Sequence, residues 1–154
     1  MDRRWRDVGV LAGALFAVNV VARLIGRFGF DNDDTAAGWV SLAMFVVIGL
    51  TLAVVAFRWG CRRPLAAWSG DMVVVVLVAM ALTVLIGPLL VGKNPFGDGA
   101  GEFFASIWLY LLATGAGTLI GYLAATALGL DHRSQQLKRF AEVKAAKPRR
   151  VVRR

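Results

Sequence analysis

The chain has very few of the residues that usually build catalytic or metal sites. Among its 154 residues there is one cysteine, Cys61, and one histidine, His132. One cysteine excludes an intramolecular disulfide framework, and two such side chains are too few for a tetrahedral zinc site, which needs three or four ligands. A Ser/His/Asp or Cys/His catalytic set is equally out of reach, and no pair of carboxylates lies in a predicted apolar pocket. We therefore expect no enzyme activity, no metal and no cofactor.

Charge is scarce as well, and it is missing where the chain is most apolar. Hydrophobic residues make up 58% of the sequence and charged residues 18%, whereas soluble domains are about 45–50% apolar. Residues 39–57 and 72–91 contain no charged side chain. A coupled transporter ordinarily carries an Asp, Glu or His in mid-membrane, but Asp7, Asp71 and Glu102 all fall at predicted helix ends. Ion-coupled transport is therefore not expected.

What the chain does have is four long apolar segments, at about 8–28, 39–57, 72–91 and 104–130. A helix rises about 1.5 Å per residue, so about 20 residues cross the roughly 30 Å hydrocarbon core of a bilayer. The sequence thus predicts an all-α membrane protein, with a four-helix transmembrane domain over residues 1–130 and a basic cytoplasmic tail over residues 131–154. Within the third segment, Gly87-Pro88 predicts a kink or an early end of the helix.

The basic residues indicate how these helices are oriented. Cytoplasmic loops of membrane proteins are enriched in lysine and arginine. With the N-terminus inside, the outer side holds only Arg23, Arg27 and Lys93, and all other basic residues lie on the inner side. We therefore expect two outward hairpins and cytoplasmic N- and C-termini.

The residue usage indicates a location. Arginine outnumbers lysine, and alanine, glycine and valine are abundant, which is typical of a GC-rich bacterial genome. A multi-pass protein of the bacterial cytoplasmic membrane is the expectation. Alternatively, the first segment is a secretory signal cleaved near Ala22, and the other three helices then keep the same orientation.

The first helix carries the only charges inside an apolar segment. Asn19, Arg23 and Arg27 recur every four residues, so they lie on one helix face. In one interpretation the arginines, near the outer end, extend to the lipid headgroups. In the other, Asn19 and Arg23 face the interior of the bundle and contact an anionic group. The second interpretation makes this face a candidate anion contact.

The fourth helix carries two stripes with a four-residue period. Small residues allow close approach of helix backbones, as in GxxxG contacts, and one stripe consists of Ala113, Gly117, Gly121, Ala125 and Gly129. The neighbouring stripe is polar and includes Tyr110, Thr114 and Thr118. The small residues predict helix packing, either within this bundle or against a second copy or another membrane protein. The polar stripe is a candidate contact surface or pathway for an anion.

Beyond Leu130 the composition changes from apolar to basic. Ser134 is placed to cap a short amphipathic helix, and basic helices of this kind lie on membrane surfaces. Residues 147–154 are expected to form a disordered basic tail. Near an anionic leaflet each basic residue contributes about 1 kcal/mol, which favours anionic lipid headgroups over nucleic acid as partner. The expected lipid contacts are Lys138, Arg139, Lys144, Arg149 and Arg150.

No motif in the sequence identifies a reaction or a ligand. Its features favour a non-catalytic accessory, scaffold or regulatory subunit. Such a protein associates through the faces of its transmembrane helices, as a homo-oligomer or within a larger membrane complex. The alternative is a small uncoupled channel or carrier for an anion or a lipid headgroup, using Arg23 and the polar stripe of the fourth helix.

Overall fold

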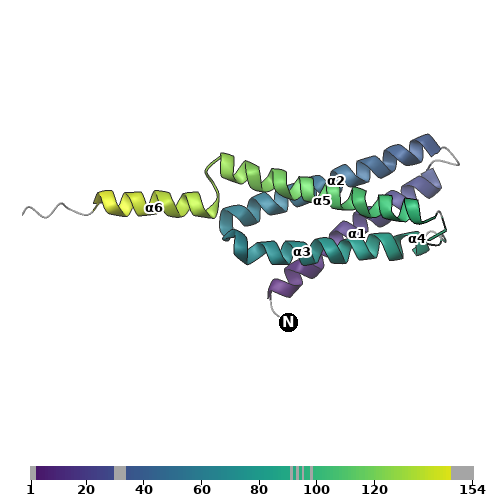
Figure 1. Ribbon diagram of the computed structural model, residues 1–154, viewed down its shortest axis with the longest axis horizontal. Coiled ribbons are helices and arrows are strands. Elements are labelled where there is room, and N and C mark those ends of the chain that lie inside the picture. Colours follow the sequence, from purple (N-terminus) through teal and green to yellow (C-terminus); the bar gives the residue numbers. More distant parts are fainter. Residues whose placement is uncertain are drawn as a thin grey trace, which may run out of the picture.

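The computed structural model describes residues 3–29, 34–90 and 99–146, together with residues 92, 94, 96 and 97. This part of the chain is helical and contains no strand (Figure 1). Four of its helices are long and apolar enough to cross a membrane, which confirms the all-α class and the multi-pass expectation. The elements are α1 (Arg3–Gly29), α2 (Asp34–Arg62), α3 (Leu65–Ala81), the π-helix η1 (Leu82–Ile86), α4 (Gly87–Leu90), α5 (Ala100–Ala127) and α6 (His132–Ala146).

The helices are longer than most of the apolar segments that predicted them, because they continue through polar residues at their ends. α3 begins at Leu65 and not at Met72. It follows directly on Pro64, whose φ of -62° is compatible with the start of a helix. Asp71 consequently lies inside α3 and is buried, whereas the sequence predicts it at a helix end.

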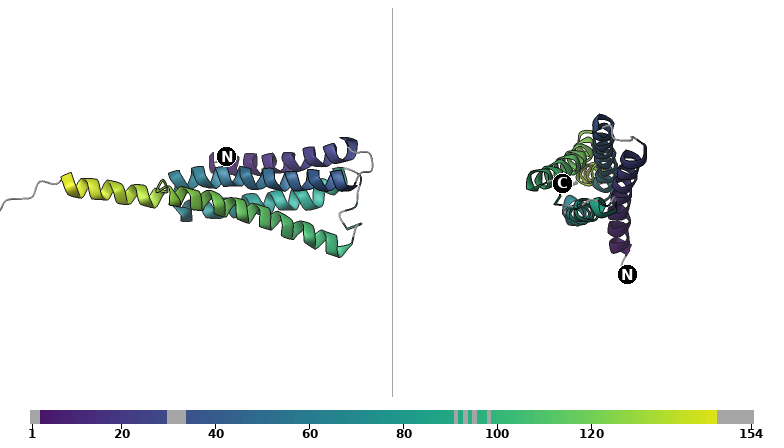
Figure 2. Two further views of the ribbon diagram at one scale, coloured as in Figure 1. Left: turned by 90° about the horizontal axis from the view of Figure 1, so that it is seen from above. Right: turned by 90° about the vertical axis from the view of Figure 1, so that its right-hand side faces the viewer.

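The four long helices form a ring whose order differs from the order along the chain. α2 packs against α1 on one side and α5 on the other, while α3 packs against α1 and, less closely, against α5. Figure 2 shows this arrangement along the bundle in its right-hand view. Gly49 lies beside Gly117 and Ala53 beside Gly121, so α2 and α5 run in the same direction. The most extensive helix contact is thus parallel and distant in sequence.

The core lies where apolar residues repeat every three or four positions on the inward faces. It contains Val8, Ala12 and Leu15 of α1, Met44, Ile48, Leu52 and Ala56 of α2, Trp68, Met72, Val75 and Ala79 of α3, and Tyr110 of α5. The other buried residues of α5 are Thr114, Gly117, Gly121 and Ala125. The buried face of α5 therefore passes from the polar stripe to the small-residue stripe, because each four-residue step drifts by about 40° around the helix.

Gly117 and Gly121 bring the backbones of α5 and α2 into direct contact. A Cβ atom added at Gly117 would overlap the backbone of Gly49, and one added at Gly121 would overlap the backbone of Ala53. A Cβ added at Gly49 would in turn come within 3.2 Å of the carbonyl oxygen of Ala113. The small-residue stripe of α5 is therefore covered by α2 of the same chain.

The third span changes helix type near its C-terminal end. α3 passes into η1 and then into α4, which contains Pro88. Proline lacks an N–H and crowds the carbonyl four residues before it. The wider π-helical turn that precedes Pro88 accommodates the ring without ending the helix. The helix continues through Gly87-Pro88 to Leu90, so the early end predicted there does not occur.

α5 ends before Gly129, which the sequence places in the packing stripe. Gly129 has a φ of 62°, a left-handed conformation that glycine adopts readily. Its N–H donates to the carbonyl of Thr126 at 2.9 Å, and the N–H of Leu130 donates to the carbonyl of Ala125 at 3.0 Å. These two bonds form a Schellman motif. Gly129 therefore ends the helix and does not extend its packing face.

α6 leaves the bundle along the long axis of the molecule (Figure 1). Asp131, and not Ser134, caps it: the Oδ2 atom of Asp131 accepts from the backbone N–H of Ser134 at 3.3 Å. Leu137, Phe140 and Val143 are exposed. As drawn, α6 neither folds back on the four long helices nor lies across the end of the bundle.

We expect Gly117→Ala and Gly121→Ala each to destabilise the bundle by about 1–3 kcal/mol, the usual range for overpacking. Each new Cβ overlaps backbone atoms, which have no rotamer to change. Thermal unfolding in detergent measures the effect. Gly115→Ala on the same helix is the matched control, since a Cβ there meets nothing within 4 Å. Equal melting temperatures for the three variants would contradict the described contact of α2 and α5.

Candidate functional site

Two polar side chains of α1, Asn19 and Arg23, meet the thioether of Met44 of α2 inside the bundle. Asn19 is only 1% exposed. Its Nδ2 donates to the Sδ of Met44 at 2.9 Å, and its Oδ1 accepts from the Nε of Arg23 at 3.0 Å. The four-residue spacing places Arg23 beside Asn19 on one helix face. Arg23 is half-buried, and its Nε is directed toward the interior of the bundle.

Gly87 leaves the space that these two side chains occupy. It is buried, and a Cβ added to it would come within 2.9 Å of both the Nε of Arg23 and the Oδ1 of Asn19. Gly87 follows directly on η1. At Gly87, directly after the π-helical turn, the third span therefore packs closely against Asn19 and Arg23 of α1.

Two further hydroxyl groups are buried without a hydrogen-bond partner among the described residues. They belong to Thr83 of η1, which is 4% exposed, and to Tyr110 of α5, which is fully buried. The Thr83 hydroxyl lies near that of Tyr110, but the two do not meet the geometry of a hydrogen bond. A buried polar group left unsatisfied costs about 1–3 kcal/mol. Such groups mark places where a water, an ion or a ligand group binds, or where strain is tolerated.

The threonines of the polar stripe use their hydroxyls inside α5. Thr114 donates to the carbonyl of Tyr110, Thr118 to that of Thr114, and Thr126 to that of Tyr122, each at 2.7 Å. Bonds of this kind satisfy the hydroxyl within its own helix. Of the candidate anion contacts on α5, Tyr110 is thus the one whose hydroxyl lacks a partner.

The basic residues chosen from the sequence have different surroundings. Exposed on α6 are Lys138, Arg139 and Lys144. The Nζ of Lys138 donates to the carbonyl of Gly129 at 3.4 Å, so it links α6 to the end of α5. Arg149 and Arg150 lie outside the described residues. The backbone of Arg27 belongs to α1, and its side chain is outside the described part.

The sequence indicates Asn19, Arg23 and Tyr110 as candidate site residues, but not the residues that lie beside them in the fold. Met44 and Thr83 stand singly within apolar segments and follow no polar repeat. Gly87 is visible only as part of a helix-breaking pair with Pro88. Only the fold places these three residues beside Asn19, Arg23 and Tyr110.

Among the described residues, no three His, Cys, Asp or Glu side chains lie together in a way that could hold a metal ion. Comparison of the chain with protein-family models, with curated proteins and with solved structures found no match.

Proposed function

We propose that the protein is a non-catalytic accessory, scaffold or regulatory subunit that associates with another membrane helix through an open face of α1. Gly9 and Gly13 support this proposal. A Cβ added at either position meets nothing within 4 Å, and Val10 between them is 73% exposed. Two glycines four residues apart allow a second helix to approach closely in lipid.

This face of α1 differs from the small-residue stripe of α5 in being uncovered. Gly117 and Gly121 already contact α2, so they are not available to a partner. In lipid, apolar surface alone does not drive helices together, and close packing of backbones contributes much of the association energy. A transmembrane helix, from a second copy or from another membrane protein, is the partner that Gly9 and Gly13 fit.

Replacing Gly9 and Gly13 together by Leu should weaken association about tenfold or more, because the added bulk separates the two helices. The melting temperature of the monomer should not change, since these positions contact no other part of the bundle. Crosslinking in native membranes and copurification in mild detergent measure association. Gly26→Leu is the control, on another face of the same helix, where an added Cβ likewise meets nothing within 4 Å. Undiminished crosslinking of the double variant would exclude this surface.

We further propose that both chain ends lie on the cytoplasmic side of a bacterial cell membrane. The N-terminal part of α1, the α2–α3 turn and α6 lie toward the same end of the bundle (Figure 1). That end carries Arg6, Arg58, Arg62 and Arg63, together with the basic residues of α6. Such an excess of arginine is typical of the cytoplasmic side.

The orientation predicts which side of the membrane reacts with an impermeant thiol reagent. In a Cys61→Ser background, Asn94→Cys should be labelled in intact cells, because Asn94 is exposed in the turn before α5. Arg58→Cys, exposed near the other end of the bundle, should be labelled only after the membrane is opened. Labelling of the Arg58→Cys protein in intact cells would reverse the proposed topology.

A second candidate function is an uncoupled channel or carrier for a small anion or a lipid headgroup. It is favoured by the buried, unpartnered hydroxyls of Thr83 and Tyr110 and by the half-buried guanidinium of Arg23. Hydroxyl and guanidinium groups both donate hydrogen bonds to anions. This arrangement supplies a polar position within an otherwise apolar bundle.

Under this alternative, proteoliposomes should exchange chloride or phosphate, and Arg23→Ala should abolish the exchange. Tyr110→Phe should slow the exchange without lowering the melting temperature, because the hydroxyl that it removes makes no hydrogen bond. Thr118→Val is the control on the same stripe, since that hydroxyl bonds within its own helix. Flux no greater than that of empty liposomes, for chloride, phosphate and organic anions alike, would eliminate the candidate.

A further inference from the structure

An apolar groove lies between α3 and α5, where the ring of helices is least tightly packed. Its volume is about 590 Å³, within the range of about 300–1,000 Å³ typical of ligand pockets. Met72, Val76 and Leu111 contribute to its walls. The two threonines that line it, Thr114 and Thr118, direct their hydroxyls to their own helix. Because such walls offer almost no solvation to a polar molecule, the groove fits a hydrocarbon chain.

The groove reaches the outer surface of the bundle along its length. Val73, Leu77 and Leu119 line it and are also exposed. In a bilayer, a groove between two spanning helices that is open in this way is in contact with lipid acyl chains. An acyl chain enters from the side, without passing through the polar ends of the bundle.

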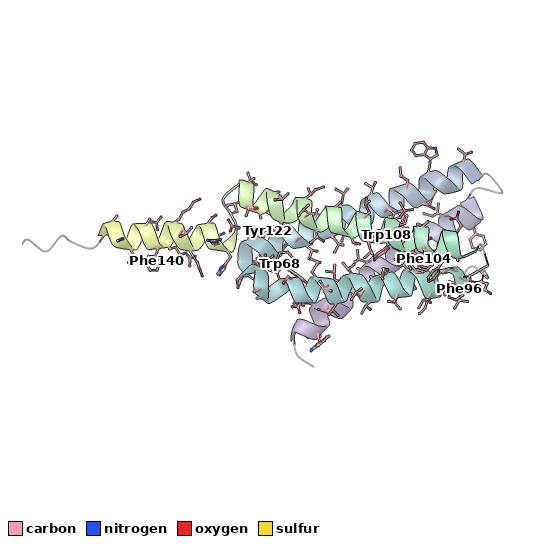
Figure 3. The ribbon with its side chains drawn as sticks, viewed as in Figure 1. Trp68, Phe96, Phe104, Trp108, Tyr122 and Phe140 are labelled. Carbon is pink, nitrogen blue, oxygen red and sulfur yellow. The ribbon has the colours of Figure 1, made fainter. Side chains whose placement is uncertain are left out.

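Trp68 lies in the groove at the end nearest the α2–α3 turn. Its ring packs against those of Trp59 and Tyr122, with centroid separations of 6.3 Å and 6.0 Å, and Figure 3 shows Trp68 and Tyr122 together near the end from which α6 leaves. Trp68 is 2% exposed, and its Nε1–H has no hydrogen-bond partner among the described residues. A buried indole N–H usually has one. The Nε1–H is itself buried, so Trp68 contributes only apolar ring surface to this end of the groove.

A second hollow, of about 350 Å³, lies between the last turn of α2 and the first turns of α6. It is lined by Cys61, Arg62, His132, Gln135, Gln136 and Arg139. No Asp or Glu is among these lining residues, so its charge is positive. Guanidinium groups bind phosphate through paired hydrogen bonds, which gives both energy and orientation.

The last turn of α2 forms a wall between the two hollows. The Cδ2 atom of Tyr122, which lines the groove, lies 3.4 Å from the position of a Cβ added at Gly60. The next residue, Cys61, accepts at its carbonyl from the Nε2 of Gln135 at 3.5 Å, and both line the basic hollow. One turn of helix thus separates the two hollows, and a ligand with a phosphate and a long apolar chain reaches both by passing around the end of α2.

We propose that the two hollows together bind one anionic phospholipid. Its phosphate contacts Arg62 and Arg139 at the end of the bundle, and one acyl chain follows the groove between α3 and α5. Such a site differs from a general attraction between basic residues and an anionic surface, because it requires two particular arginines and a space of defined shape.

Native mass spectrometry of the purified protein, with added phosphatidylglycerol or phosphatidylcholine, tests the headgroup contact. Retention of one phosphatidylglycerol per chain should fall about tenfold or more in Arg62→Gln/Arg139→Gln, and phosphatidylcholine should not be retained. Arg58→Gln/Lys144→Gln removes the same charge from exposed positions that line neither hollow, and it should retain the lipid. Equal losses in the two double variants, or equal retention of both lipids, would overturn the proposal.

The groove is tested separately by filling it. Gly115 lines the groove and has open space beside its Cα, so Gly115→Trp should displace the acyl chain and reduce lipid retention while both arginines remain. Ala116→Trp is the control, since Ala116 is exposed and does not line the groove. Should Gly115→Trp lower the melting temperature, the smaller Gly115→Leu replaces it. Full lipid retention with the groove filled would contradict the assignment of the chain to this groove.

Discussion

The direct contact between the backbones of α2 and α5 determines how the remaining helices are arranged. Gly117 and Gly121 allow this approach because any side chain there would overlap the backbone of α2. In lipid, close contact of this kind supplies much of the energy that burial of apolar surface supplies in water. With one face held against α2, α5 packs only loosely against α3. The groove between α3 and α5 is therefore a geometric result of the tightest contact in the bundle.

The polar interior depends on a second local feature, the π-helical turn before Pro88. Helical turns of this type are frequent at functional sites, and here η1 carries Thr83 and leads into Gly87. Gly87 leaves space for Asn19 and Arg23, while Thr83 lies near Tyr110. Gly87, which lies beside Asn19 and Arg23, is four residues after Thr83 in the same span. Asn19 and Arg23 satisfy part of each other's hydrogen bonding, whereas the hydroxyls of Thr83 and Tyr110 have no partner within the described residues.

The sequence predicts the class of this protein and its four spans, because a bilayer requires long apolar helices and few other patterns satisfy that requirement. It also indicates Gly117 and Gly121 as close-packing positions, but not the helix that they meet. A four-residue repeat shows which residues share one face of a helix, but it does not show which helix packs on that face. That α2 packs there is known only from the fold. Gly129 does not pack as the repeat predicts, because its left-handed backbone conformation ends α5. The places of Met44 and Thr83 beside Asn19 and Tyr110 could not be predicted. A single sulfur or hydroxyl in an apolar segment forms no sequence pattern, so its neighbours are known only from the fold.

The parallel pairing of α2 with α5 has a consequence for how the protein is made. Spans enter the bilayer in the order of synthesis, so α2 is inserted well before its closest neighbour exists. During that interval the backbone at Gly49 and Ala53, which α5 later covers, is open to lipid and to any other helix nearby. The nascent chain therefore passes through a stage in which α2 offers a close-packing surface that the finished protein does not. Completion of α5 closes that surface, and a ribosome that stops before α5 leaves it open.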